Sequence, residues 1–384
     1  MNEVVLHVGK VSGISGSEAH LLTLLPDLRR RGWDVRFCLL HEGEPGASEF
    51  AARLEAAGVP VEPVRLRGDL DPVAFLRLLR LVRATRPVLL HTHLVHADAY
   101  GLPAGRLAGV PVLASTKHGF NTFRERPAFA AVDRRLSRLA NLHIAISAGL
   151  ARYLAETEGL DGSRFEIVHY GIAAGADPLP PPHAPRLLCV GRLVPIKGHD
   201  TLLHALALAV ASIPDLTLEI AGDGPLRGRL EELARDLGIA EAATFAGRVT
   251  SVADAYARAG IVVVPSRGEG FGMVALEAAE RGRAVIASAV GGLPEIVEDG
   301  VTGVLVKPGD VEELAAAIAA LAADPERAAA LGAAARERAL REFTLERCAD
   351  RTDALYRTAV DRSASTRSRA AAASSATTKS HGTR

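Results

Sequence analysis

The sequence is poor in cysteine and in aromatic residues, and each shortage excludes a class of protein. Its 384 residues include three cysteines, Cys38, Cys189 and Cys348, which lie far apart and form no CxxC pair. Three isolated cysteines argue against a disulfide framework and a structural zinc site, and they fit a reducing, cytoplasmic compartment. Aromatic residues make up 4% of the chain, too few for the base-stacking surface of a single-stranded nucleic-acid binder.

Long apolar runs and an excess of charge of one sign are also missing. No run of about 18 apolar residues occurs, so we expect no membrane-spanning helix. The chain passes from Met1 directly into Val4–Val8, without the basic region and long apolar core of a signal peptide. Lysine plus arginine and aspartate plus glutamate both number 45, so the formal net charge is zero. Nucleic acid is therefore not an expected partner.

Short apolar runs alternate with longer helical patterns, which predicts βαβ units on parallel sheets. A chain of this length, with 48% hydrophobic residues, is expected to divide into two domains. The expected strands of the first half are Val4–Val8, Val35–Leu40, Val61–Val64, Val88–His91, Val112–Ser115, His143–Ile146 and Glu166–His169. The expected helices between them are Glu18–Arg31, Gly46–Ala57, Pro72–Thr85, Ala97–Ala108, Phe129–Ala140 and Ala148–Glu156.

A proline-rich segment interrupts this alternation. Five prolines within Asp177–Pro185 are incompatible with a helix or a central strand and predict an extended linker. The alternation then resumes, with expected strands at Arg186–Val190, Leu216–Ala221, Ala243–Ala246, Ile261–Val264, Ala284–Ser288 and Gly303–Val306. The expected helices are Asp200–Ile213, Leu226–Leu237, Val252–Ala259, Met273–Arg281, Val311–Ala323 and Pro325–Phe343.

These patterns define the expected domain organisation. We expect a Rossmann-like N-terminal domain over residues 1–176, a linker over 177–185 and a second Rossmann-like domain over 186–343, with their parallel sheets facing across a central cleft. Residues 344–360 should form a C-terminal helix that could return to the N-terminal domain. Residues 361–384 contain mainly Ser, Thr, Ala and Arg and are expected to form a disordered tail.

The segment Pro265–Glu277 combines a glycine loop with a helix start. It follows the apolar run Ile261–Val264, expected to be a buried strand, and Gly270 and Gly272 flank Phe271 before a stretch of strong helix formers. Unpaired amides at the helix start, together with the positive end of the helix dipole, would stabilise an anion such as a phosphate.

Two glutamates extend this pattern. Glu269 precedes the helix, and Glu277 lies eight positions later, about two helical turns. Carboxylates are good acceptors for sugar hydroxyls. A ligand with a sugar, a diphosphate and a ribose would therefore use both glutamates and the amides between them. The alternative is that Glu269 only complements the helix dipole and that Glu277 is a solvated helix residue.

Arg192 and Lys197 lie in a glycine-bounded loop after the first strand of the second half. In a parallel sheet, the edge at which this strand ends also holds the Glu269 loop. Two fixed cations there could neutralise a diphosphate without a metal, although both could also be solvated surface side chains. Glu295, in the glycine loop that starts at Gly291, is expected to cap or orient rather than react.

The first half offers a glycine-rich loop and several histidines. The loop Gly9–Glu18 suits close approach of a phosphate, but its spacing matches neither GxGxxG nor a P-loop. His91, His93 and His96 cluster without the carboxylate or cysteine partners of a zinc enzyme, so a metal is not expected. For His93 and for His118, which both follow strands, polar recognition, proton handling and a purely structural role stay open.

Arginines recur at three-residue spacing in and directly after the helix expected over Pro72–Thr85, at Arg77, Arg80, Arg83 and Arg86, opposite Leu and Val. A second basic stretch contains Arg124, Arg126, Arg134, Arg135 and Arg138. One interpretation is an ordinary amphipathic helix whose arginine stems cover apolar surface. The other is a basic face that contacts anionic membrane lipid or an anionic acceptor.

Together these features resemble the family 4 glycosyltransferases, which are nucleotide-sugar-dependent enzymes of the GT-B fold. The resemblance covers roughly residues 3–360. It rests on segments that occur in the same order and spacing as in that family: Val190–Gly198, Ala221–Leu226, Pro265–Glu277 and Gly291–Glu295.

The resemblance implies retaining transfer of a hexosyl group from a UDP- or GDP-linked sugar, without a metal or a separate cofactor. It implies that Glu269 holds donor-sugar hydroxyls, that Glu277 holds ribose hydroxyls, and that His118 lies under the sugar near the reacting carbon. The cations implied to stabilise the leaving diphosphate are Arg192 and Lys197. The remaining donor-binding residues implied, mainly through backbone amides, are Gly16, Gly270, Phe271, Gly272, Met273 and Val274.

Two departures from the family pattern leave details open. Ser15-Gly16 stands where a glycine pair is expected, so the amide that reaches the phosphate is undetermined. His169–Ala173 replaces the more usual Asn-Gly and acidic pattern, which leaves nucleotide or hinge contacts there open.

The expected partners are a nucleotide-sugar donor and a glycan, lipid-linked saccharide or small-molecule acceptor, in the cytoplasm and with peripheral contact to the inner membrane face if the arginines bind lipid. The alternative functions are a nucleotide-sugar 2-epimerase, a phosphorylase and a non-catalytic sugar-nucleotide binding protein. A hydride-transfer enzyme is disfavoured because neither half supplies GxGxxG followed by an acidic residue about 20 positions later.

Overall fold

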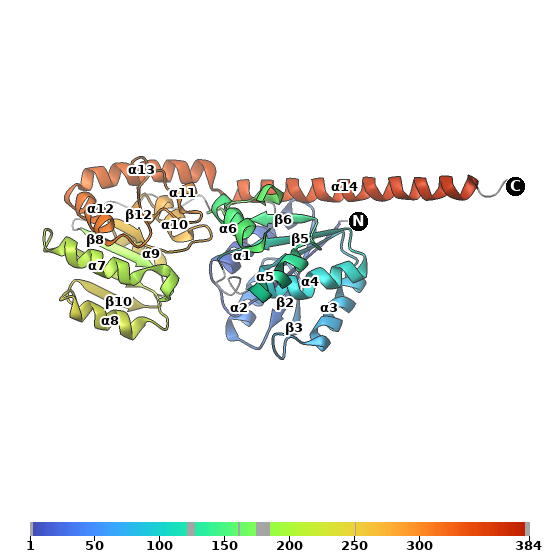
Figure 1. The fold of residues 1–384 in the computed structure, drawn as a ribbon, viewed down its shortest axis with the longest axis horizontal. Coiled ribbons are helices and arrows are strands. Elements are labelled where there is room, and N and C mark those ends of the chain that lie inside the picture. The colour runs from blue at the N-terminus through green and yellow to red at the C-terminus, as the bar shows by residue number, and fades with distance from the viewer. Residues whose placement is uncertain (1–2, 121–126, 160–161, 174–184, 250, 381–384) are drawn as a thin grey trace. The chain divides into compact units, whose positions relative to one another are not determined.

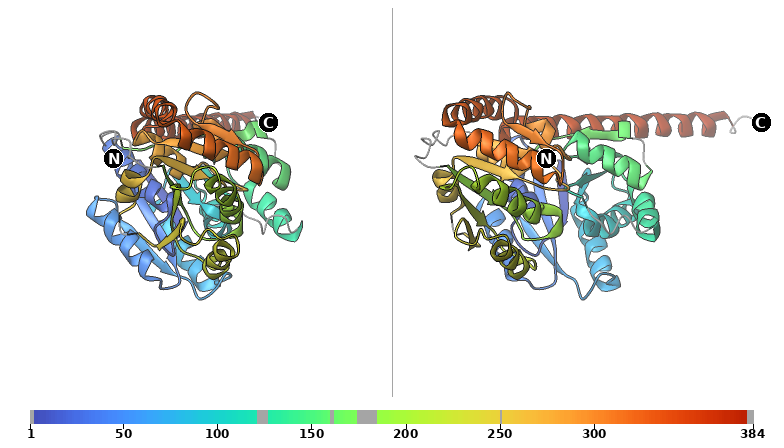
Figure 2. Two further views of the ribbon diagram at one scale, coloured as in Figure 1. Left: turned by 90° about the vertical axis from the view of Figure 1, so that its left-hand side faces the viewer. Right: turned by 60° about the vertical axis from the view of Figure 1, so that its left-hand side comes forward.

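The protein consists of two compact units, each built on one parallel sheet. The computed structural model describes residues 3–120, 127–159, 162–173, 185–249 and 251–380. The first unit contains residues 1–146, 154–168 and 346–384, and the second contains 147–153 and 169–345. In both units helices lie on the two faces of the sheet (Figures 1 and 2). The prediction of two Rossmann-like α/β domains is confirmed.

The first unit has a seven-stranded parallel sheet in the order β3-β2-β1-β4-β5-β6-β7. Its strands are β1 (Val4–Lys10), β2 (Asp34–His41), β3 (Val61–Arg65), β4 (Leu89–His93), β5 (Val112–Lys117), β6 (Leu142–Ala145) and β7 (Phe165–Ile167). The helices that follow these strands are α1 (Gly16–Arg30), α2 (Pro45–Ala56), α3 (Pro72–Thr85), α4 (Leu94–Ala108), α5 (Pro127–Ser137) and α6 (Ala148–Glu158).

The second unit has a six-stranded parallel sheet in the order β10-β9-β8-β11-β12-β13. Its strands are β8 (Arg186–Val190), β9 (Thr217–Ala221), β10 (Ala243–Gly247), β11 (Ile261–Val264), β12 (Ala284–Ser288) and β13 (Val304–Val306). Its helices are α7 (His199–Val210), α8 (Arg227–Asp236), α9 (Val252–Arg258), α10 (Met273–Glu280), α11 (Leu293–Ile296), α12 (Val311–Ala323) and α13 (Pro325–Glu342).

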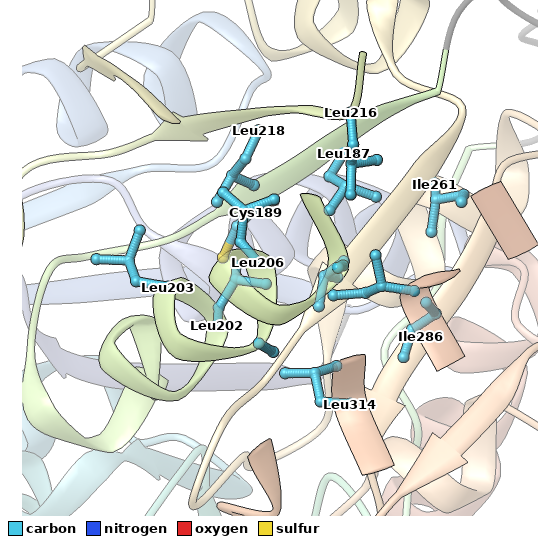
Figure 3. Packing of buried hydrophobic residues seen from close by; sticks show 14 of the residues in the cluster. Leu187, Cys189, Leu202, Leu203, Leu206, Leu216, Leu218, Ile261, Ile286 and Leu314 are labelled. Carbon is cyan, nitrogen blue, oxygen red and sulfur yellow. The ribbon is translucent and has the colours of Figure 1, made fainter. Parts of the chain in front are cut away.

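Both sheets form because short runs of aliphatic residues are buried on two faces. All residues of β11 are buried, as are Ala284–Ala287 of β12 and the aliphatic starts of β4 and β5, Leu89–Leu90 and Val112–Ala114. Such runs are typical of central strands in parallel sheets. In the second unit, leucines of α7 pack on β8 and β9 through Leu187 and Leu218 (Figure 3).

Each sheet reverses its strand order once, at β1/β4 in the first unit and at β8/β11 in the second. At such a switch point the two neighbouring loops diverge to opposite faces and leave a crevice at the carboxyl ends of the strands, where ligands of open α/β sheets bind. The loops that follow β8 and β11 carry Arg192, Lys197 and Glu269. These three residues, which were predicted to bind the sugar nucleotide, therefore lie at the switch point of the second sheet.

The unit boundaries differ from the predicted ones on both sides of the linker. The first turn of α6 belongs to the second unit, where Glu295 accepts from the backbone amides of Ala148 and Gly149. The side chain of Ser147, just before the helix, donates its hydroxyl hydrogen to the Gly270 carbonyl at 2.6 Å. Residues 169–173 also belong to the second unit, and 177–184 of the predicted linker lie outside the described residues.

The last helix, α14 (Leu345–Ser380), packs on the first unit. Its Cys348, Ala349 and Tyr356 are buried in the core of that unit, and Asp353 accepts a hydrogen bond from the Trp33 indole at 2.6 Å. Residues 361–380, which were predicted to belong to a disordered tail, instead continue α14 as one helix to Ser380 (Figure 1), and 381–384 lie outside the described residues. Alanine is the best helix former, and each residue added to an existing helix gains a backbone hydrogen bond. No helix within the described residues has the length and apolar character needed to cross a bilayer.

Substitution of Gly332 tests the packing of α13 against the second sheet. A Cβ at this position would lie 2.2 Å from the Gly282 carbonyl oxygen, so we expect Gly332→Ala to lower the free energy of unfolding by about 1–3 kcal/mol, the usual cost of overpacking. Gly228, in the first turn of α8, has no atom within 4 Å of its hypothetical Cβ. Gly228→Ala should leave stability unchanged or raise it by less than about 1 kcal/mol. Urea unfolding measures the free energy of unfolding of both variants. Equal stability of the two variants would contradict the packing argument.

Candidate functional site

The loops after β8 and β11 lie against each other so closely that only glycine fits between them. A Cβ on Gly198 would lie 2.0 Å from the Pro265 carbonyl oxygen, and Gly198 has a φ of 67°, which also favours glycine. The Arg267 amide donates to the Ile196 carbonyl at 2.8 Å and joins the two loops. The loops after β8 and β9 also pack tightly against each other. A Cβ on Gly222 would lie 1.8 Å from the Gly191 carbonyl oxygen.

This approach brings two predicted site residues into contact. Lys197 Nζ lies 2.7 Å from Glu269 Oε2, and Ser266 Oγ donates to the same oxygen at 3.1 Å. The side chains of Lys197 and Glu269 are 24% and 16% exposed, so the ion pair is partly shielded from water. Arg192 is exposed, and its side chain makes no hydrogen bond or ion pair within the described part of the chain. One cation of the predicted pair is therefore engaged and the other is not.

The start of α10 has the geometry of an anion site. Gly272 precedes the helix with a φ of 116°, and a Cβ there would lie 2.6 Å from Leu293 Cδ2. The helix itself leaves the amides of its first turn, including those of Met273 and Val274, without intrahelical acceptors. Gly270 and Phe271 shape the preceding loop. The Phe271 side chain is 2% exposed and packs on His169 at 5.4 Å between ring centroids, so it anchors the loop from inside.

Glu277 is held in place by two side chains that the sequence did not single out. Tyr256, from α9, donates its hydroxyl hydrogen to Glu277 Oε2 at 2.9 Å, and the Arg281 guanidinium lies 5.0 Å above the Tyr256 ring centre. Burial raises the pKa of Glu277, and the Tyr256 hydrogen bond and the charge of Arg281 act against that rise. Glu277 is therefore an oriented, partly buried carboxylate, unlike the solvated helix residue of the alternative interpretation. Tyr256 was missed because a lone tyrosine in a helix looks like any core residue.

Glu295 caps a helix, as expected for it. It accepts from the Ala148 and Gly149 amides at 3.0 and 2.9 Å, and from His169 Nε2 at 2.8 Å. Burial raises the pKa of Glu295, but these hydrogen bonds outweigh it and lower the pKa overall. The loop that starts at Gly291 thus holds the first turn of α6 instead of offering a reactive carboxylate.

In the first unit, Gly16 is the first residue of α1 and is exposed. Glu18 folds back on this helix start, where it accepts from the Ser15 amide at 3.1 Å and from the Ser15 hydroxyl at 2.5 Å. Glu18 is 7% exposed and had no assigned role in the sequence, although the spacing Ser-x-x-Glu is typical of a capping box. At the end of the predicted phosphate loop, the Ser15 amide therefore already donates to the buried Glu18 carboxylate.

His118 lies directly after β5, in contact with other histidines. His93 Nδ1 is 3.0 Å from His118 Nε2, and His7 Nδ1 is 2.8 Å from His93 Nε2. His91 makes separate contacts, at 2.6 Å to Thr116 Oγ1 and at 2.5 Å to the Tyr356 hydroxyl of α14. His93 and His118, which were each expected at the end of a strand, contact each other. His7 was missed because a histidine inside an apolar strand gives no motif.

A buried ion cluster lies on the opposite face of β4 and β5. Lys117 Nζ lies 2.6 Å from Asp98 Oδ2 and 3.3 Å from Asp133 Oδ1, and all three side chains are at most 2% exposed. Thr92 and Ser115 donate hydroxyl hydrogens to Asp98 Oδ1. Because buried charges need such partners, the cluster fixes α4 and α5 to the end of β5, next to His118.

Comparisons with known proteins agree with this architecture. Residues 14–174 match the family profile Glycosyltransferase Family 4, and residues 176–338 match Glycosyl transferases group 1. The solved structure of Anabaena HepE in complex with UDP and glucose is similar over 93% of this chain and 100% of that chain, with a TM-score of 0.80 and 21% identity. Sucrose-phosphate synthase from Thermosynechococcus elongatus is similar over 93% and 99%, with a TM-score of 0.74 and 24% identity.

Curated relatives match over part of their length. A GDP-mannose-dependent alpha-(1-6)-phosphatidylinositol monomannoside mannosyltransferase from Mycolicibacterium smegmatis is 41% identical over 165 residues, which are 41% of this chain and 43% of the relative. A D-inositol 3-phosphate glycosyltransferase from Thermomonospora curvata is 33% identical over 288 residues, 64% of this chain and 66% of the relative. With two consecutive family profiles and the matching fold, the chain belongs to the family 4 glycosyltransferases of the GT-B fold.

Proposed function

We propose that this protein transfers a hexosyl group from a nucleoside diphosphate sugar, linked to UDP or GDP, to an acceptor hydroxyl with retention of configuration. The observation that carries the proposal is the contact between Lys197 and Glu269 beside the start of α10. In a sugar nucleotide the anomeric carbon is bonded directly to the diphosphate. A cation for the phosphate and a carboxylate for sugar hydroxyls must therefore be neighbours, as these two side chains are.

The diphosphate would be held by amides and cations. The first-turn amides of Met273 and Val274 and the positive end of α10 would bind its oxygens, with Arg192 and Lys197 as counter-charges. Gly16, at the exposed start of α1, would contribute an amide from the first unit. This set can neutralise a diphosphate without a metal, so we propose a metal-independent enzyme.

Glu269 and Glu277 would bind the two sugars of the donor. Glu269 accepts from hydroxyls of the transferred hexose. Glu277, with one oxygen fixed by Tyr256, keeps its other oxygen to accept from the ribose hydroxyls. An oriented carboxylate loses less conformational entropy on binding than a mobile one.

In the reaction, the bond from the anomeric carbon to the diphosphate oxygen breaks, and a bond to the acceptor oxygen forms on the same face of the sugar. The acceptor proton passes to the departing phosphate oxygen. Arg192, Lys197 and the α10 amides stabilise the negative charge that develops on the leaving group, which is usually the largest catalytic contribution of such groups. His118 would lie under the sugar near the reacting carbon.

The donor is tested by a thermal-shift panel of UDP, GDP and ADP with their hexose derivatives. A true donor at 100 times its Kd stabilises the folded protein by about 2.7 kcal/mol, so one base should raise the melting temperature and the others should not. Product analysis with the stabilising donor and glycan or inositol-containing acceptors then distinguishes the mechanisms. Sugar transfer that needs an acceptor and continues in EDTA supports the proposal. Epimerised donor without acceptor, or binding without turnover, refutes it.

The role of the two cations predicts a large kinetic effect. Arg192→Ala and Lys197→Ala should each lower kcat about a hundredfold or more, because a group that stabilises transition-state charge is lost. Arg229→Ala and Lys307→Ala remove exposed cations from elsewhere on the second unit and should leave kcat within about twofold. Near-normal turnover of both site variants would show that neither cation has the assigned role.

We further propose that the acceptor is met at an anionic membrane surface through α3. Arg77, Arg80 and Arg83 are exposed, and Leu70, just before the helix, is 90% exposed. Val73 and Leu76 on α3 are also about half exposed, at 47% and 49%. Basic residues beside exposed apolar side chains are typical of helices that bind the membrane interface. Such contact would make this protein a cytoplasmic enzyme that binds the inner membrane face peripherally.

Charge reversal on α3 tests this contact. Each basic residue near an anionic surface contributes about 1 kcal/mol, so reversing Arg77, Arg80 and Arg83 to Glu should weaken binding to phosphatidylglycerol vesicles about a hundredfold or more. Arg229→Glu on α8 is the control. Co-sedimentation with vesicles of phosphatidylglycerol or of phosphatidylcholine measures the binding of each protein to the membrane. Equal binding of the triple variant and the unmodified chain would argue against a membrane role for α3.

A further inference from the structure

Three histidines of the first unit form a hydrogen-bonded chain that ends at His118. His7 Nδ1 contacts His93 Nε2 at 2.8 Å, and His93 Nδ1 contacts His118 Nε2 at 3.0 Å. The rings of His7 and His93 lie within 5° of parallel with centroids 5.2 Å apart. Together with the short contact between nitrogens, this describes two rings joined edge to edge, as a hydrogen bond in the ring plane requires.

Burial keeps these imidazoles neutral. His7 and His93 are 0% and 3% exposed. Burial lowers the pKa of His7, His93 and His118, and a positive charge on a neighbouring histidine such as His20 would lower each pKa further. A neutral imidazole has one N–H group and one lone pair. Each contact in the chain therefore pairs the N–H of one ring with the lone pair of the next.

The His7 end of the chain indicates the direction of its hydrogen bonds. Only two arrangements satisfy both hydrogen bonds, with every proton on Nδ1 or every proton on Nε2. His7 Nε2 is buried and has no hydrogen-bond partner within the described residues. With protons on Nε2 it would be an orphaned N–H group, which is the rarer defect in protein interiors, whereas protons on Nδ1 leave only an unused lone pair there. The Nδ1–H arrangement is therefore favoured for all three rings.

The backbone beside His93 is strained. Leu94 has a φ of 70°, a left-handed conformation that costs a non-glycine residue about 1–2 kcal/mol. It is also the first residue of α4, so β4 passes into the helix directly after His93 with no intervening loop. Strain that persists at such a position indicates that the surrounding structure requires this placement of the middle ring.

The same histidines are poorly suited to a metal ion. Ring nitrogens of His7, His91 and His93 lie within 4.8 Å of one another. However, both nitrogens of His91 and both of His93 make hydrogen bonds, as does His7 Nδ1. Only His7 Nε2 remains available as a ligand. A metal would have to break several of these contacts, so the arrangement favours a proton-ordered chain.

We propose that His7 and His93 are positioning residues that hold His118 as the neutral Nδ1–H tautomer. His93 Nδ1–H donates to His118 Nε2 and thereby blocks protonation at that nitrogen. His118 then carries its proton on Nδ1 and has no charge. The importance of this state for sugar transfer rests on the proposed function, but the tautomer itself does not.

Long-range ¹H–¹⁵N spectra of the full chain labelled with ¹⁵N-histidine read the tautomer directly. The His118 signals are identified by their loss in His118→Asn. We expect a single neutral Nδ1–H form between about pH 5 and 8, the range in which an unperturbed histidine titrates. His93→Gln, whose amide can accept from His7 and donate to His118, should keep this form. His93→Phe fills the same space without a donor, and His118 should then show the Nε2–H form and titrate at higher pH.

An Nε2–H or protonated His118 in the unmodified chain would overturn the proposal, even if His93→Phe failed to fold. So would an unchanged His118 spectrum in a folded His93→Phe variant, or stoichiometric zinc in the purified protein. These outcomes are separate from the test of function. Loss of the predicted tautomer in a chain that transfers sugar refutes only the positioning role. The expected tautomer in a chain without transferase activity refutes only the proposed function.

Discussion

The site in the second unit depends on how closely two backbones approach at the switch point of the sheet. Gly198 lies where any side chain would meet the Pro265 carbonyl, and Gly222 lies in the same way against Gly191. Because the loops after β8 and β11 are pressed together, Lys197 of one reaches Glu269 of the other. Larger residues at these glycines would separate the loops, and the cation and the carboxylate would no longer be neighbours.

The carboxyl end of the first sheet contains buried polar groups on both faces, and each face stabilises them differently. On one face Lys117 and two aspartates form charged pairs, with hydroxyl donors to complete the hydrogen bonds. On the other, His91 and His93 stay neutral and bond to other rings and hydroxyls. The alternation of side chains along β4 and β5 separates the two sets by one residue. A charged cluster can thus lie beside His118 in the sequence without contacting the histidine chain.

The strands could be predicted from local pattern because burial in a parallel sheet leaves continuous aliphatic runs such as Ile261–Val264. The glycine loop before α10 was predictable for a similar reason, since its backbone demands are local. The contacts that hold the site residues in place could not be predicted from the sequence. Tyr256 contacts Glu277 from another helix, and His7 reaches His93 across 86 positions. Such contacts between distant residues give no pattern in the local sequence. The extent of α14 was misjudged because a polar, alanine-rich segment has no core-forming face, yet it can extend a helix that already exists.

The two units differ in the kind of polar group that lies at the carboxyl ends of their strands. The second unit holds fixed charges, with Lys197 and Glu269 paired and Arg192 exposed. The first unit holds His118 in a setting where burial lowers its pKa. In the proposed reaction the breaking glycosidic bond leaves positive charge on the sugar, as in the oxocarbenium-like transition states of glycoside chemistry. A protonated histidine under that carbon would repel this charge. If His118 lies where we propose, a neutral ring would place no positive charge against the sugar, and for this reason the protonation state of His118 would matter to the reaction as well as its position.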